Sequence, residues 1–344
     1  MKGTILITGA GGYIGTQMVK DFLSRGYKVK ALDRYFFGYD FDDVASGDLE
    51  VIKDDIRWFK PEILKGVDVV IDLSSISNDP SAELNPVATN EINYLGALNM
   101  AQKAKELGVK KYILSSSCSI YGAGSDKRML TEESELNPVS KYAESKINAE
   151  RDISTLSDKN FSVTFLRNAT AYGLSKDRMR FDLILNIMTL NAWKNQKIFI
   201  LGGGDQWRPL CHIKDIIKAF RLVTEEQDIA KINKQAFNVG SNEQNYKVKQ
   251  VAHIFKEIFP NIKIENIPSD PDKRSYNVCF DKINKVLNFK TELAPVDGIR
   301  EIARALNEDL VSGDEIRTNT LKFYKYLLDA DKVLSKVKIK NRIF

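Results

Sequence analysis

The chain has 344 residues with a hydrophobic content of 43% and a charged content of 28%, which is typical of a globular protein with one large or two moderate domains. No apolar run reaches the roughly 18 residues of a membrane helix, and the N-terminal MKGTILITG lacks the apolar segment of a secretory signal, so we expect a cytoplasmic protein. The net charge of +5 is spread along the chain and the three cysteines are scattered, which argues against a nucleic-acid partner, a disulfide framework and a metal site.

Short apolar strands alternate with longer helical patterns through the first half of the chain. We predict strands at TILITG, YKVKALD, LEVIKDD, VDVVIDLS, KKYILSSS and FSVTFLRN, and helices at 13–26, 85–108 and 137–158. Nearly continuous apolar strands that alternate with helices are typical of a parallel sheet covered on both faces. The sequence therefore predicts an α/β fold with a doubly wound parallel sheet of the Rossmann type.

The first predicted strand runs directly into GAGGYIG, which places Gly9, Gly12 and Gly15 before an amphipathic helix. A strand-to-helix turn of this kind lets the backbone approach a pyrophosphate and directs helix N–H groups toward its charge. The second strand ends at Asp33, whose carboxylate accepts hydrogen bonds from an adenosine ribose and repels a 2′-phosphate. We therefore expect NAD as the cofactor, and NADP stays open because Arg34 can neutralise a 2′-phosphate.

The segment SKYAESK places Tyr142 and Lys146 four residues apart on one face of a predicted helix. A tyrosine with an ordinary pKa of about 10 becomes a base at neutral pH only if positive charge stabilises its phenolate by about 4 kcal/mol. A neighbouring ammonium and an oxidised nicotinamide supply such charge. We predict that Tyr142 takes a proton from a substrate hydroxyl as hydride leaves the same carbon. The same spacing also occurs in helices without a catalytic function, so the spacing alone does not show that Tyr142 and Lys146 are catalytic.

Three motifs in this order, GAGGYIG, SSSCSIYG and YAESK, resemble the extended short-chain dehydrogenase/reductase family. More narrowly, the chain is similar to its nucleotide-sugar epimerases and dehydratases, of which UDP-galactose 4-epimerase is a familiar member. The resemblance covers residues 3 to about 305. It implies a nucleotide-diphosphate sugar as substrate and a catalytic triad of Ser117, Tyr142 and Lys146, in which Ser117 hydrogen-bonds the reacting sugar hydroxyl.

The predicted cofactor site extends beyond the glycine turn. The topology puts the residues after the third strand near the adenine, and the resemblance implies small residues after the fourth strand, an asparagine beside the cofactor and a lysine on the nicotinamide ribose. The predicted cofactor-binding residues are Gly9, Gly12, Tyr13, Ile14, Gly15, Asp33, Arg34, Asp55, Ile56, Leu73, Ser74, Ser75, Asn93 and Lys146.

Sugar 4,6-dehydratases of this family typically have Asp and Glu at the two positions after the catalytic hydroxyl, whereas this chain has Cys118 and Ser119. Elimination needs an acid and a base at those positions, and a serine hydroxyl of very high pKa cannot be the base. Cys118 could act only as a thiolate, and nothing near it in the sequence lowers its pKa. The sequence therefore disfavours dehydration and favours oxidation, reduction or epimerisation.

The second half of the chain offers candidate contacts for a nucleotide sugar. Arg208, in GGGDQWRPLCHIKD, and Arg274, in DPDKRSYNV, resemble the two arginines that bind the diphosphate in this family. A guanidinium presents a planar set of donors that suits phosphate oxygens. Thr170 replaces the Asn that many relatives have at its position. The predicted substrate-binding residues are Ser117, Thr170, Arg178, Arg180, Asn186, Arg208 and Arg274.

Beyond residue 173 the alternation of strands and helices weakens, and AFNVGS at 236–241 is a late strand that can return to the first sheet. The basic C-terminus is interpreted as a terminal helix or strand rather than a membrane or nucleic-acid contact. The predicted division is an NAD-binding domain at 1–173 with a returning segment at about 213–250, a smaller mixed α/β substrate domain at 174–212 and 251–330, and a basic tail at 331–344.

The favoured function is an NAD-dependent nucleotide-sugar epimerase that works through a keto-sugar intermediate at C4. A nucleotide-sugar dehydrogenase or 4-ketoreductase stays open because it uses the same triad. The alternative from another class is a non-catalytic NAD-binding protein, but such proteins usually lack the Tyr or the Lys that this chain retains. The resemblance also implies that helices 85–108 and 137–158 form a four-helix interface in a homodimer.

Overall fold

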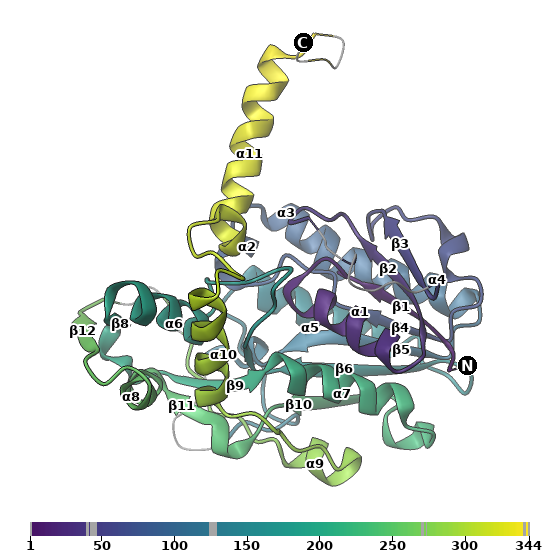
Figure 1. Cartoon of the computed structure of the whole chain (residues 1–344). Coiled ribbons are helices and arrows are strands. Elements are labelled where there is room, and N and C mark those ends of the chain that lie inside the picture. The colour runs from purple at the N-terminus through teal and green to yellow at the C-terminus, as the bar shows by residue number, and fades with distance from the viewer. Residues whose placement is uncertain are drawn as a thin grey trace.

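The structure, a computed structural model, describes residues 2–38, 41, 47–123, 129–269, 272, 274–339 and 342. Its largest element is a seven-stranded sheet with the order β10-β6-β5-β4-β1-β2-β3, in which all described neighbours run parallel (Figure 1). The predicted doubly wound parallel sheet is therefore confirmed. The strands of this sheet are β1 Thr4–Thr8, β2 Lys28–Asp33, β3 Leu49–Lys53, β4 Val69–Asp72, β5 Lys111–Ser117, β6 Ser162–Asn168 and β10 Gln235–Val239.

Helices cover both faces of this sheet (Figure 1). The α-helices are α1 Tyr13–Ser24, α2 Asp79–Ala82, α3 Pro86–Asn90, α4 Ala97–Glu106, α5 Lys141–Ser154, α6 Ile184–Asn195, α7 Ile213–Glu225, α8 Val248–Ile254, α9 Asp281–Leu287, α10 Pro295–Asn307 and α11 Thr320–Val337. The short helical turns are η1 Pro61–Leu64, η2 Glu91–Gly96, η3 Cys118–Tyr121, η4 Gly202–Gly204, η5 Ile229–Lys231, η6 Asn242–Gln244, η7 Phe255–Glu257 and η8 Ile316–Thr318.

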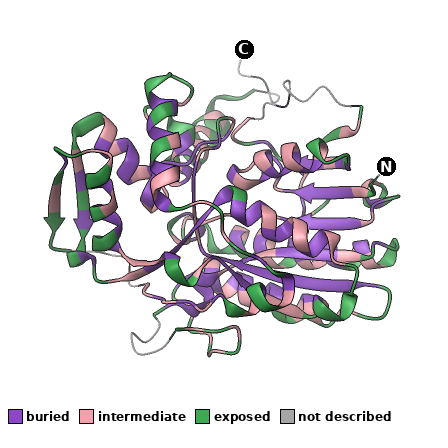
Figure 2. Ribbon diagram, turned by 60° about the horizontal axis from the view of Figure 1, so that its bottom comes forward, coloured by how far each residue is buried: buried purple, intermediate pink, exposed green. Residues whose placement is uncertain are grey.

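The two faces of the sheet form separate apolar clusters because successive strand residues point to opposite sides. Ile5 and Ile7 of β1 pack in one cluster with Phe22 of α1 and Phe220 of α7. Leu6 packs in the other cluster, where α4 and α5 contribute mainly small side chains. Figure 2 shows the central strands of the large sheet buried along most of their length, which explains why they are apolar in sequence, whereas the edge strand β3 has no buried residue.

The two long helices predicted beside the cofactor site are present with altered details. The helix predicted at 85–108 is a run of α3, the π-helical η2 and α4, and π-helical turns are frequent at functional sites. The helix predicted at 137–158 is α5, which begins at Lys141 because Ser140 caps it. The Ser140 Oγ accepts a hydrogen bond from the Ala143 N–H at 3.2 Å.

The second half of the chain forms two small sheets beside the large one (Figure 1). β12 pairs in parallel with β8, and β9 lies between β7 and β11. The late strand β10 instead joins the edge of the large sheet beside β6, where the sequence allowed it to return. The remaining strands are β7 Thr170–Tyr172, β8 Lys197–Leu201, β9 Trp207–His212, β11 Asn245–Lys247 and β12 Lys263–Ile267.

The C-terminal helix α11 projects away from the rest of the molecule (Figure 1). Only its first turns pack on the body, where Thr320 and Phe323 are buried. The predicted basic tail at 331–344 therefore begins inside this helix, and residues 340, 341, 343 and 344 lie outside the described part of the chain. No described helix combines the length and the apolar character needed to cross a membrane.

Candidate active site

Most of the predicted site residues line one cavity. Its walls come from the segments that follow β1, β2, β4, β5 and β6, which is where an open α/β sheet binds its ligands. Asn93, Asn186 and Arg208 lie behind these walls. The predicted residues that line the cavity are Gly9, Gly12, Tyr13, Ile14, Gly15, Asp33, Arg34, Asp55, Ile56, Leu73, Ser74, Ser75, Ser117, Tyr142, Lys146, Thr170, Arg178, Arg180 and Arg274.

The turn after β1 packs so tightly that two positions require glycine. Gly9 has a φ of +68°, and a Cβ there would lie 2.8 Å from the carbonyl carbon of Leu73. A Cβ on Gly15 would lie 2.1 Å from the oxygen of Gly9. Among the described residues, no side chain caps the N-terminus of α1 at Gly12. The first N–H groups of α1 are therefore available to an anionic ligand.

Asp33 lies at the cavity end of β2, and backbone groups hold its carboxylate. It accepts hydrogen bonds from the N–H groups of Gly11 at 3.1 Å and Tyr35 at 2.6 Å. Burial raises the pKa of Asp33, and these two donors oppose the rise. Arg34 pairs with Asp55 at 3.1 Å, which leaves its charge less available to a 2′-phosphate.

Asn93 does not line the cavity but holds the loop after β4, which does. Its side-chain oxygen accepts a hydrogen bond from the Ile76 N–H at 2.8 Å, and its amide nitrogen donates to the Ser145 Oγ at 3.2 Å. These bonds connect η2 to the loop after β4 and to α5. The same loop carries Ser75, whose buried Oγ has no hydrogen-bond partner among the described residues and faces the cavity.

Ser117, Tyr142 and Lys146 lie together in the cavity. Ser117 ends β5, whereas Tyr142 and Lys146 lie one turn apart on α5. Ser117 and Tyr142 both line the cavity, and the Nζ of Lys146 lies 5.8 Å from the centre of the Tyr142 ring. The three groups can therefore act on one substrate hydroxyl.

The electrostatic surroundings of Tyr142 differ from the sequence-based expectation. Burial raises the pKa of Tyr142, and the negative charge of Asp79 raises it further. The Ser117 hydroxyl and the charge of Arg180 oppose this rise in the pKa. Burial also lowers the pKa of Lys146 to about 8. The phenolate therefore needs more positive charge than these side chains supply, and an oxidised nicotinamide carries such a charge.

The two residues after Ser117 point in different directions. Cys118 is buried, its Sγ lies 3.1 Å from the carbonyl oxygen of Arg167, and burial raises the pKa of its thiol. A thiolate base at this position is therefore not supported. Ser119 faces the cavity, and its buried Oγ has no hydrogen-bond partner among the described residues. Its hydroxyl is available to a substrate.

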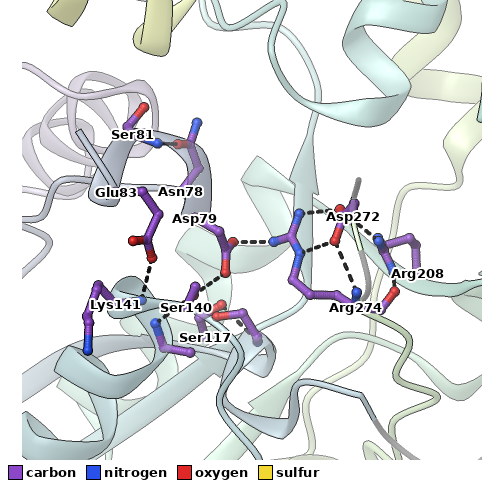
Figure 3. Close-up of polar contacts among 12 residues, drawn as sticks. Asn78, Asp79, Ser81, Glu83, Ser117, Ser140, Lys141, Arg208, Asp272 and Arg274 are labelled. Carbon is purple, nitrogen blue, oxygen red and sulfur yellow. Dashed lines mark hydrogen bonds and ion pairs between the residues drawn. The ribbon is translucent and has the colours of Figure 1, made fainter. Parts of the chain in front are cut away.

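The predicted arginine pair is brought together by Asp272 (Figure 3). The Nη2 of Arg208 and the Nε of Arg274 lie 2.9 and 2.7 Å from its carboxylate oxygens. Burial acts to raise the pKa of Asp272, but the two guanidinium groups overcome this effect and hold it below its usual range. Arg208 also donates to the carbonyl of Arg274. Arg208 therefore supports the segment from which Arg274 reaches the cavity.

Asp79 connects Arg274 to the start of α5 (Figure 3). Its carboxylate pairs with Arg274 and accepts a hydrogen bond of 2.5 Å from Ser140, the residue that caps α5. The sequence-based prediction missed Asp79, which lies in the turn SNDPS. Asn78 has a φ of +144°, and strained backbone of this kind clusters at functional sites.

Arg180 precedes α6 and lines the cavity, whereas Asn186 lies within α6 and does not line it. Arg180 pairs with Asp182 at 2.8 Å and donates to the Ser77 Oγ at 3.2 Å. Asn186 is fully buried and donates to the hydroxyl of Tyr13 at 3.1 Å. Asn186 therefore holds the wall together instead of facing the cavity.

Arg178 lies at the Asp33 end of the cavity, where its guanidinium is 3.6 Å from the centre of the Phe37 ring. Tyr324 of α11 also lines this end. No local sequence signal identified Phe37 or Tyr324, because they reach the cavity from segments that are far apart in the chain.

A model described as the NAD dependent epimerase/dehydratase family matches residues 5–240. That span is more than half of the chain and includes the glycine turn and the Ser–Tyr–Lys triad. The chain belongs to this family. The enzyme therefore uses NAD, as the sequence predicted, and the resemblance to nucleotide-sugar epimerases and dehydratases is confirmed.

Individual relatives are distant. The enzyme is 26% identical over 309 residues to UDP-glucuronic acid decarboxylase 4 of Arabidopsis thaliana, a match that covers 86% of this chain and 66% of that protein. It is 25% identical to a putative UDP-glucose 4-epimerase of Methanocaldococcus jannaschii, with 87% and 96% of the two chains covered. The solved structure of MoeE5 in complex with UDP-glucuronic acid and NAD shares the fold, with a TM-score of 0.78, 22% identity and coverage of 89% and 100%.

The cavity fits a bound NAD. The glycine turn and the uncapped start of α1 suit the pyrophosphate, the Asp33 carboxylate suits the adenosine ribose, and the unpartnered Oγ of Ser75 offers a further polar contact. Lys146 is placed to hold the nicotinamide ribose next to Tyr142.

Proposed function

We propose that the enzyme is a nucleotide-sugar epimerase that oxidises and then reduces its substrate at C4. The main support is the triad of Ser117, Tyr142 and Lys146 in one cavity, combined with a hydroxyl at Ser119 where a dehydratase carries a carboxylate. Epimerisation needs only the triad and NAD, whereas elimination needs a further acid and base.

In this mechanism, Ser117 hydrogen-bonds the C4 hydroxyl and the Tyr142 oxygen accepts its proton. Bound NAD supplies a reversible hydride acceptor. The Lys146 ammonium stabilises the Tyr142 phenolate and orients the nicotinamide ribose. After the keto sugar turns within the cavity, Tyr142 returns the proton to the same oxygen, so the overall reaction is redox-neutral.

The substrate is proposed to be a uridine diphosphate sugar. Arg274 faces the cavity from the second half of the molecule, and Asp272 and Asp79 orient its guanidinium. A guanidinium held in this way can bind a diphosphate through two parallel hydrogen bonds. The names of the relatives above all refer to UDP-linked sugars, which makes uridine the first base to test.

Product analysis tests the proposal. The purified enzyme is incubated with UDP-glucose, UDP-glucuronic acid or UDP-N-acetylglucosamine without added NAD, and the sugars are followed by NMR. We expect one of them to equilibrate with its C4 epimer without accumulation of NADH. Stoichiometric consumption of NADH with a keto sugar would instead identify a 4-ketoreductase. Loss of carbon dioxide from UDP-glucuronic acid would identify a decarboxylase like the plant relative.

Tyr142→Phe tests the proposed base directly. Without the phenolic oxygen no group takes the C4 proton, so we expect turnover to fall by about 10²- to 10⁴-fold while NAD remains bound. Tyr326→Phe, which alters an exposed tyrosine of α11, is the matched control. Turnover by Tyr142→Phe at the rate of the control would refute the catalytic role.

A 4,6-dehydratase is the second candidate because Asp79 places one carboxylate near Tyr142. If Asp79 is an acid or base of elimination, Asp79→Asn abolishes turnover and the wild-type product lacks one water. An epimerase retains turnover in this variant at saturating substrate, with a higher KM because Asp79 also orients Arg274. The acid limb of its pH–rate profile then moves to lower pH, because removal of the negative charge lowers the pKa of Tyr142.

A further inference from the structure

Arg178 is a buried cation, and no carboxylate among the described residues is in hydrogen-bond contact with it. It is 4% exposed, and its Nη1 and Nη2 donate to the carbonyl of Met179 at 2.6 Å and the Oγ1 of Thr320 at 3.0 Å. Among the described residues, its Nε has no hydrogen-bond partner. A buried charge of this kind destabilises a protein unless an opposite charge joins it. An anionic ligand that enters the cavity can be that partner.

The guanidinium lies at the cofactor end of the cavity. Burial raises the pKa of Asp33, and the charge of Arg178 is one of the effects that oppose this rise. Asp33 in turn accepts a hydrogen bond from Gly11, which belongs to the glycine turn. Arg178, the carboxylate of Asp33 and the glycine turn therefore border the same region of the cavity.

The C-terminal segment holds Arg178 in this place. Thr320 binds the guanidinium and donates from its N–H to Asp182 at 3.2 Å. The Tyr324 ring lies 5.5 Å from the Phe37 ring, on which Arg178 stacks. An arginine fixed by a ring and a hydroxyl keeps its free N–H in one direction, so a ligand anion is bound with little further loss of conformational freedom.

We propose that Arg178 binds the pyrophosphate of NAD, not the diphosphate of the sugar nucleotide, and that Thr320 and Tyr324 position it. The carboxylate of Asp33 repels the 2′-phosphate of NADP, which leaves the pyrophosphate as the cofactor anion at this end. The inference concerns cofactor binding alone, so it holds whichever sugar reaction the enzyme catalyses.

Calorimetry on the cofactor-free protein separates the two possible anions. NAD, ADP, adenosine and UDP are titrated into the wild type, into Arg178→Met and into Arg300→Met, which alters an exposed arginine of α10. We expect Arg178→Met to bind NAD and ADP about 10- to 100-fold more weakly, with unchanged affinity for adenosine and UDP. Unchanged NAD affinity, with or without weaker UDP binding, would overturn the proposal.

Two milder variants keep the test decisive if Arg178→Met does not fold. Arg178→Lys keeps the positive charge but loses the planar set of N–H donors of the guanidinium. Thr320→Val removes one hydrogen bond that orients the Arg178 side chain. We expect both to weaken NAD by severalfold and to leave adenosine unchanged. NAD affinity equal to that of the wild type in both variants would refute the assignment. Because no sugar substrate is present, failure of the proposed epimerase activity would not affect these results.

Discussion

Lys146 shows how a side chain with a proposed catalytic role can oppose stability. It is almost fully buried, and burial lowers the pKa of its ammonium group from 10.5 to about 8. Between these values the unfolded chain binds the proton more tightly than the folded one. The free energy of unfolding therefore rises with pH from about 8 to about 10.5, and the buried charge destabilises the fold below this window.

Lys146→Met should therefore stabilise the fold while it abolishes turnover. We expect the free energy of unfolding at neutral pH to rise by about 1 to 3 kcal/mol, and its increase between pH 8 and 10.5 to weaken. Urea unfolding across this range measures both effects. Lys332→Met, at an exposed position of α11, should change neither quantity. A less stable Lys146→Met protein would show that the ammonium contributes packing or pairing that outweighs its burial.

Single residues were predictable where local spacing carries the chemistry. Tyr142 and Lys146 follow from one helical turn, and Asp33 follows from the end of a strand. Asp79 was not predictable in this way, because its position near Tyr142 depends on how the loop after β4 folds over α5. Tyr324 depends on the docking of a helix almost at the other end of the chain.

At the scale of elements, a buried ion pair connects β6 to α5, the helix that carries Tyr142 and Lys146. Glu150 of α5 accepts hydrogen bonds from Arg167 of β6, at 2.7 Å from its Nη2, and from Ser116 of β5. These bonds lie directly behind Ser117. They hold β5, β6 and α5 in the register that places the triad.

Replacement of one member of the Glu150–Arg167 ion pair should lower the free energy of unfolding more than replacement of both. Glu150→Met leaves a buried, unpaired guanidinium, and we expect it to lower the free energy of unfolding by about 3 to 5 kcal/mol. The double variant Glu150→Met/Arg167→Met should recover part of this loss, since no isolated charge remains. Urea unfolding of the three variants, including Arg167→Met, gives the coupling energy. A double variant no more stable than Glu150→Met would contradict this account.

Elements were predicted well where strands are buried on both faces, because their apolar runs are unmistakable. All seven strands of the large sheet lie within or overlap the predicted segments. The π-helical turn at η2 had no such signal, since its residues also suit an α-helix. The small sheets of the second half were not predicted, because β7 and β11 have only three residues each.

At the scale of the whole molecule, we expect a homodimer through η2, α4 and α5. Leu95 is 46% exposed on η2, which packs directly against α5. An exposed leucine on this pair of helices suits burial between two copies. Leu95→Arg should therefore shift the protein toward monomer, by at least about tenfold in the dimer dissociation constant. Leu310→Arg, which alters an equally exposed leucine elsewhere, is the control.

Light scattering at micromolar concentrations measures the masses of both variants. A wild-type protein that is already monomeric would overturn the expectation, and so would a dimer unaffected by Leu95→Arg. The helices themselves were predicted from the sequence. Their assembly rests on family resemblance, because one chain alone does not specify which of its exposed surfaces meets a second copy.

The position of α11 determines which truncations and fusions at the C-terminus leave the cavity intact. Its first turns supply part of the cofactor cavity, while its later turns stand in solvent. A truncation designed to favour crystal growth could remove the whole of α11. A cut placed before Thr320 would remove Tyr324 from the cavity and release Arg178, whereas a fusion partner attached to the far end stays clear of both.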